Sequence, residues 1–159
     1  MNQKQLDITI RRAEPDDYEA IWAILNDPKV IWGTLQLPYT AKETRRQRME
    51  KNTDDRINLL ALVQNEPVGQ LSLAMQTRPR RKHVGDIGMA VRDAWQGQGI
   101  GTALMAAAVD LADRWLNLLR LELDVYTDNE PSNHINKFDS ASQTFSRLFD
   151  QDRRCAAQN

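Results

Sequence analysis

Five short segments of the chain have the apolar patterning of β-strands, either alternating with polar residues or continuously apolar. They are residues 8–11, 57–63, 68–73, 83–91 and 119–125. The turn residues Asn65-Glu66-Pro67 separate the second segment from the third, so these two are predicted to form a hairpin. Gly85 and Gly88 interrupt the fourth segment and indicate a bulge or a close approach by another group.

Three other segments have the spacing of amphipathic helices. The first opens at Glu14-Pro15-Asp16-Asp17 and ends at Asp27-Pro28. A capping box, Thr40-Ala41-Lys42-Glu43, predicts a very polar second helix through about Lys51. The third begins near Ile100 and carries Leu104, Ala108, Leu111 and Trp115 on its apolar face. The order strand, helix, helix, strand, strand, strand, helix, strand predicts an α/β (α+β) domain with a mixed, mostly antiparallel sheet.

The pattern changes after Pro131. Residues 132–159 are polar and weakly periodic, no strand is predicted there, and a helix through Gln143–Phe149 is compatible with the sequence. We therefore expect an N-terminal domain of residues 1–131 and a divergent or truncated tail of residues 132–159.

Composition narrows the functional classes. The 159 residues suit one domain, and 21 Lys+Arg against 22 Asp+Glu give a net charge of -1, which argues against nucleic acid as a partner. No apolar run approaches the ~18 residues of a membrane span, and the first residues do not form a signal peptide, so no membrane partner is expected. The single cysteine, Cys155, cannot form an internal disulfide, and a cytoplasmic location is the simplest expectation.

The glycine-rich loop Gln96-Gly97-Gln98-Gly99-Ile100-Gly101 lies between a strand and a helix. Its glycines allow a sharp turn, and the free N–H groups and dipole of the helix N-terminus favour an anion such as a diphosphate. A strand-to-helix turn with no chemical role remains the alternative. Neither a Walker loop nor a Rossmann fingerprint fits, because Thr102-Ala103 follows the last glycine and the glycine spacing differs.

This Gln-x-x-Gly-x-Gly loop, following a strand that ends in Val91-Arg92-Asp93-Ala94-Trp95, resembles the acyl-coenzyme A loop of the GNAT family of N-acetyltransferases. The resemblance runs from about Ile8 to Pro131 and includes the segment Asp128-Asn129-Glu130-Pro131. It is greatest to bacterial amino-acid N-acetyltransferases, in features such as Thr34-Leu35-Gln36, Arg78-Pro79-Arg80-Arg81 and Trp115-Leu116.

The resemblance implies a fold with a splayed central strand and acetyl-CoA as co-substrate, with no metal. Pantetheine would pair with Met89, Ala90 and Val91. The residues that would hold the diphosphate are Gln96, Gly97, Gln98, Gly99, Ile100, Gly101 and Thr102. Asn129 matches an asparagine that contacts the coenzyme in such enzymes, and a helix N-cap is its alternative role.

The implied reaction is attack of a deprotonated amine on the thioester, which requires a base and an oxyanion donor. Asp86, His83 and Glu122 are the candidate bases, and each is alternatively a structural polar residue; the N–H near Ala90 is the candidate donor. The expected activity is acetylation of a small primary amine, an amino acid. The alternatives are a coenzyme A-binding module without catalysis and an acetyltransferase for protein N-termini or lysines.

The family resemblance places the acceptor pocket at Trp32, Thr34, Leu35 and Gln36, although these residues would equally serve to cover the core. The basic run Arg78-Pro79-Arg80-Arg81-Lys82 would attract an acceptor carboxylate, or would simply be a solvated loop.

The resemblance breaks near residue 131. Many members carry a tyrosine that protonates the leaving thiolate, where this chain has Asn136; Ser132 replaces an alanine, and Phe138-Asp139-Ser140 replaces an aromatic-glycine turn. The last two strands of the fold have no evident counterpart. A reading-frame change or truncation in the gene and a genuinely divergent C-terminus both remain open, and translating the other two frames distinguishes them. Missing strands would leave a sheet edge open, so a homodimer is expected.

Overall fold

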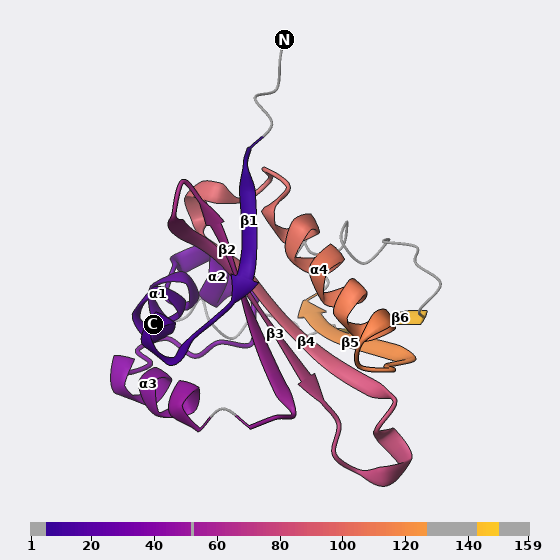
Figure 1. The fold of residues 1–159 in the computed structure, drawn as a ribbon. Helices are drawn as coiled ribbons and strands as arrows, with labels where there is room; N and C mark the ends of the chain where they lie inside the picture. Colours follow the sequence, from indigo (N-terminus) through magenta and orange to yellow (C-terminus); the bar gives the residue numbers. More distant parts are fainter. Residues whose placement is uncertain (1–5, 52, 127–142, 150–159) are drawn as a thin grey trace.

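One mixed sheet forms the centre of the protein. The computed structural model describes residues 6–51, 53–126 and 143–149, and within them six strands pair in sequence order (Figure 1). The strands are β1 (Ile8–Arg12), β2 (Arg56–Val63), β3 (Glu66–Met75), β4 (Val84–Val91), β5 (Arg120–Tyr126) and β6 (Gln143–Phe149). The pairs β1–β2, β2–β3 and β3–β4 are antiparallel, whereas β4–β5 and β5–β6 are parallel. The expected mixed, mostly antiparallel sheet is confirmed.

The helices cover both faces of this sheet. The helices η1 (Pro15–Asp17), α1 (Tyr18–Leu25), α2 (Pro28–Gly33) and α3 (Lys42–Glu50) lie on one side, and α4 (Ile100–Arg114) lies on the other (Figure 1). Two short helices, η2 (Pro79–Arg81) and η3 (Asp93–Trp95), flank β4. Strand β2 is apolar on both faces because Leu60 packs against the α1 side while Leu59 packs against the α4 side.

Several local predictions are wrong in detail. A further short helix, α2, which includes Trp32 and Gly33, follows the predicted helix end at Asp27-Pro28, where none was predicted. The residue that caps α3 is Ala41, since the Thr40 hydroxyl instead donates to the Leu37 carbonyl at 2.9 Å. Trp115 is the C-cap of α4, after the last helical residue, and its side chain is exposed instead of packed in the core.

The tail contributes a strand at residues for which no strand was predicted and a helix was compatible with the sequence. Residues Gln143–Phe149 form β6 along the open edge of β5, in register from Arg120–Gln143 to Tyr126–Phe149. The unpaired N–H and C=O groups of an edge strand favour such pairing, and Thr and Phe are common in strands. The sequence had indicated that the C-terminal strands of the fold could be missing. The structure contains one strand there, β6. In the parts that the structure describes, no helix has the length and apolar character needed to cross a membrane.

Candidate functional site

Strands β4 and β5 separate part-way along their length. They pair from Val84–Arg120 to Ile87–Leu123, and no pair follows within the described residues. Strand β4 nevertheless continues to Val91, and β5 continues to Tyr126. The chain therefore has the splayed central strand that its sequence predicts, and the splay begins immediately after Ile87.

The register of β4 against β3 decides which backbone groups face the splay. The Gln76 N–H donates to the Val84 carbonyl at 3.0 Å, and the Arg92 N–H donates to the Val68 carbonyl at 2.9 Å. In an antiparallel pair, residues that exchange such bonds alternate with residues that do not. The even-numbered residues of β4 therefore direct their N–H and C=O groups toward β3, and the odd-numbered residues direct theirs toward β5.

Met89 and Val91 accordingly present backbone groups at the splay. The Val91 carbonyl accepts a hydrogen bond from Gln96 Nε2 at 3.1 Å, whereas Met89 retains its N–H and C=O on this side. Ala90 lies opposite Gln70, and its N–H faces β3. Among the N–H groups near Ala90, where the oxyanion donor is expected, the one that faces the splay is that of Met89.

The glycine loop lies between the end of β4 and the first turn of α4. Gly97 has φ 74° and Gly99, the N-cap of α4, has φ 85°, a left-handed conformation that favours glycine. No atom lies within 4 Å of where a Cβ would be at either position, so the space beside the loop is open. Ile100 is buried in the core and anchors the helix start. The first N–H groups of α4 have no partner within the helix and face a place suited to an anion.

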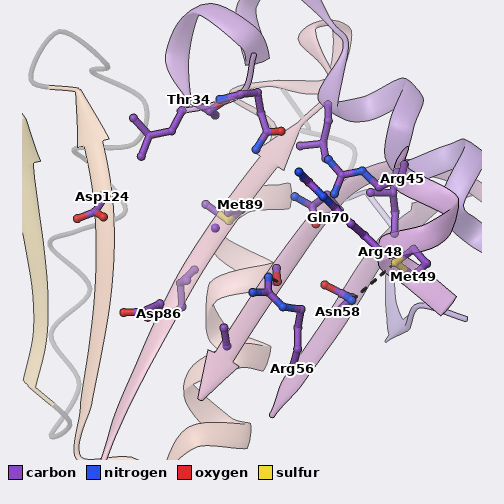
Figure 2. A pocket seen from close by; sticks show the side chains of 18 of the residues that line it. Thr34, Arg45, Arg48, Met49, Arg56, Asn58, Gln70, Asp86, Met89 and Asp124 are labelled. Carbon is purple, nitrogen blue, oxygen red and sulfur yellow. Dashed lines mark hydrogen bonds between the residues drawn. The ribbon is translucent and has the colours of Figure 1, made fainter. Parts of the chain in front are cut away.

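A pocket of about 650 Å³ lies on the opposite side, between the sheet and helices α1 and α3 (Figure 2). Thr34, Leu35 and Gln36, which the family resemblance suggests for the acceptor site, are among the residues that line it. Trp32 is not part of the lining and is 60% exposed. The pocket reaches the splay, since its wall includes Ile87, Gly88 and Met89 of β4 and Leu123 and Asp124 of β5.

The three candidate bases have different surroundings. Asp86 lines the pocket and accepts a hydrogen bond from Gln76 Nε2. Glu122 is beside it in register and only 8% exposed, but its carboxylate lies 2.8 Å from Arg81 and 3.1 Å from Arg120 in ion pairs. His83 is exposed, and it precedes β4. The structure therefore brings only Asp86 of the three to the pocket.

Sequence reasoning missed one carboxylate and a set of cations at this site. Asp124 lines the pocket next to the splay, and alternation along β5 places it on the same face as Glu122. Four basic residues also line the pocket: Arg45, Arg48, Lys51 and Arg56. The spacing of Arg45, Arg48 and Met49 along α3 is that of one helix face and was the available signal.

The basic run at residues 78–82 does not reach the pocket lining. Its Arg81 is paired with Glu122 instead. Asn129, Ser132, Asn136 and residues 138–140 lie outside the described residues. Among the described residues no group of three or more His, Cys, Asp or Glu side chains is placed to hold a metal ion.

Comparison with known proteins agrees with this geometry. The chain matches the acetyltransferase (GNAT) family over residues 16–137. The chain belongs to this family. It is 37% identical over 131 residues to the L-amino acid N-acetyltransferase AaaT of Escherichia coli (strain K12), covering 82% of this chain and 80% of that protein.

Solved GNAT structures share the fold. The acetyltransferase of the GNAT family from Streptococcus pneumoniae superposes with a TM-score of 0.69 at 27% identity, covering 81% of each chain. The ribosomal-protein-alanine N-acetyltransferase from Brucella melitensis superposes with a TM-score of 0.69 at 25% identity, covering 80% of each chain. The GNAT fold and an N-acetyltransferase family membership are thus established, as the loop motif predicted.

Proposed function

We propose that this chain transfers the acetyl group of acetyl-CoA to the primary amine of a small molecule, an amino acid. One observation carries the proposal: the pocket reaches the splay of β4 and β5 beside Met89, where the family resemblance implies that pantetheine pairs. A volume of about 650 Å³ is within the range of small-molecule sites. The named activity of the E. coli relative, on L-amino acids, supports the same acceptor class.

Acetyl-CoA fits the other half of the site. It supplies an acetyl thioester that a neutral amine can attack. Gln96 to Thr102 would hold its diphosphate through N–H groups at the start of α4, and the open space beside Gly97 and Gly99 accommodates phosphate oxygens. Backbone groups of Met89 and Val91 face the splay and would pair with pantetheine. Ala90 completes this stretch, and Asn129 is a further proposed contact.

Asp86 is the group that we assign to the acceptor amine. Its carboxylate lies on the pocket face of β4, two residues before Gly88, where the splay begins. It accepts or relays the proton that the amine must lose, with Asp124 on the facing strand as the second carboxylate. Asp86→Asn is expected to lower kcat by about 100-fold or more. An equal loss in Asp124→Asn alone would move the assignment to that residue.

A thiol-release assay with acetyl-CoA and a panel of free L-amino acids, spermidine and an N-terminal peptide tests the proposal. Acetylation of one or more amino acids is expected, with the peptide and spermidine weaker. Coenzyme binding in calorimetry without thiol release for any amine would favour a binding module. Preference for the peptide would favour protein N-terminal acetylation.

The remaining expectations extend this proposal. We divide the chain into the acetyltransferase domain, residues 1–131, and a divergent tail, residues 132–159, and the family match, which ends at residue 137, supports a boundary in this region. The single Cys155 supports a cytoplasmic location.

We further propose a homodimer. Trp32, Leu35, Leu37 and Tyr39 are 56–99% exposed within one short segment, and such apolar exposure is typical of an interface. Light scattering coupled to size-exclusion chromatography measures the mass directly, and a mass near the 18.2 kDa of one chain would exclude the dimer.

A further inference from the structure

One wall of the acceptor pocket is strongly basic. This basic wall consists of Arg45, Arg48, Lys51 and Arg56, contributed by α3, the segment after it and the start of β2. The pocket's carboxylates, Asp86 and Asp124, come from β4 and β5 on the other side (Figure 2). The pocket therefore carries acidic side chains on the side of the splay and basic side chains on the side of α3.

The protein supplies little compensation for the basic wall. Within the described residues, Arg45, Arg48 and Arg56 form no ion pair, and Arg56 Nη1 donates only to the Ser72 hydroxyl at 3.0 Å. The Nε of the half-buried Arg45 has no hydrogen-bond partner there. By contrast, Arg46 on the same helix lies 2.6 Å from Glu43 and also pairs with Glu50, outside the pocket.

Uncompensated like charges around a partly buried site favour an anion. Burial, together with the positive charges of Arg48 and Arg56, lowers the pKa of the Arg45 guanidinium below its ordinary value. A bound anion would relieve the like-charge repulsion. A guanidinium group pairs with a carboxylate through charge-assisted N–H···O bonds, which are stronger than hydrogen bonds between neutral groups.

We propose that the basic wall binds the carboxylate of the acceptor, with Arg45 as its principal contact, and thereby selects free amino acids over amines that lack a carboxylate. The inference rests on the proposed acetyltransferase function. A zwitterionic amino acid spans the pocket with its ammonium group toward Asp86 and Asp124 and its carboxylate toward Arg45. This orientation places the amine at the splay, where the thioester is attacked, and makes the basic wall a determinant of specificity rather than of the chemical step.

Matched acceptor pairs test the inference in the full-length protein. L-phenylalanine, L-leucine and L-methionine are each compared with their carboxamides, which keep the amine and the side chain but lose the negative charge. We expect kcat/KM to fall about 10- to 100-fold from acid to amide in the wild type, the range for losing a charge-assisted pair. Equal values for acid and amide would overturn the inference and leave the acetyltransferase function intact.

Variants locate the effect. Arg45→Gln is expected to raise the KM of the amino acids about 10- to 100-fold while the activity on the carboxamides and the KM of acetyl-CoA stay within about twofold. Arg46→Gln, one residue away and outside the pocket, is the matched control and leaves all three unchanged. A rise in the KM of acetyl-CoA in Arg45→Gln would assign the wall to the coenzyme and refute the proposal.

Binding measurements separate failure of this inference from failure of the proposed function. If no amine causes thiol release from acetyl-CoA, the proposed function fails. Calorimetry of L-phenylalanine and its carboxamide then still measures whether the basic wall binds a carboxylate. Tighter binding of the acid, lost in Arg45→Gln and kept in Arg46→Gln, supports carboxylate recognition. Absence of that difference in binding refutes it.

Discussion

The substitution Gly99→Ala, which adds a single methyl group, tests the proposed coenzyme-binding loop. The φ of Gly99, 85°, lies in the left-handed region, and Gly99 is the N-cap of α4. An L-residue in this region costs roughly 1–2 kcal/mol more than in the right-handed one. Because no atom lies within 4 Å of the added Cβ, the penalty of Gly99→Ala comes from the backbone alone, with no steric clash.

This energetic penalty is expected to reduce either the stability of the fold or the affinity for acetyl-CoA. If the loop keeps its conformation, Gly99→Ala lowers the free energy of unfolding by about 1–2 kcal/mol. If the loop relaxes, the N–H groups at the start of α4 lose their alignment, and the KM of acetyl-CoA rises by up to about 5- to 30-fold. In both cases the KM of the amino acid stays unchanged, since the acceptor pocket lies on the other face of the sheet.

Urea unfolding and thiol-release kinetics measure the two effects on the same protein sample. The matched control is Asn117→Ala, because Asn117 has φ 51° in the turn between α4 and β5. It should lose stability without any change in the KM of acetyl-CoA. The reasoning is refuted if Gly99→Ala leaves both stability and the KM of acetyl-CoA unchanged, or if it raises the KM of the amino acid equally.

Three further substitutions probe other parts of the structure. Glu122→Gln removes the carboxylate that pairs with Arg81 and Arg120. It should lower the free energy of unfolding by about 1–2 kcal/mol and leave kcat within about twofold of wild type. A loss of about 100-fold in kcat would instead support Glu122 as the base. The hydrogen bond from Arg11 lowers the pKa of Asp17 below 3.8, so this pair stabilises the fold above about pH 4 and the stabilisation is lost as pH falls through the lowered pKa. Asp17→Asn should therefore be less stable than wild type by about 1 kcal/mol in urea unfolding at pH 7, and the difference should shrink as pH falls through the lowered pKa; a constant difference would contradict this. Leu104→Ala, at a fully buried position of α4, should cost about 2–5 kcal/mol in urea unfolding, and a loss under 1 kcal/mol would contradict the assigned core.

The sequence by itself determined the elements and the coenzyme loop. Strand and helix periodicity is local, so β1 to β5, α1 and α4 follow from the spacing of apolar residues along each segment. The glycine loop was also readable, because Gly97 and Gly99 adopt backbone angles that other residues rarely take. Its position at a helix start then indicated an anion, and the order of elements indicated the GNAT family.

Only the tertiary structure decided the acceptor half. The ion pair with Arg81, which lies 41 residues earlier in the chain, argues against Glu122 as the base, and periodicity carries no information about such a pairing. The basic wall likewise combines α3 with the start of β2, and its role depends on which side chains find no counter-charge. Register also made the difference between Ala90 and Met89, since a shift of one residue reverses the direction of the backbone groups. The glycine loop proposed for the coenzyme is local along the chain and could be predicted from it, whereas the proposed acceptor site is assembled from distant segments and required the fold.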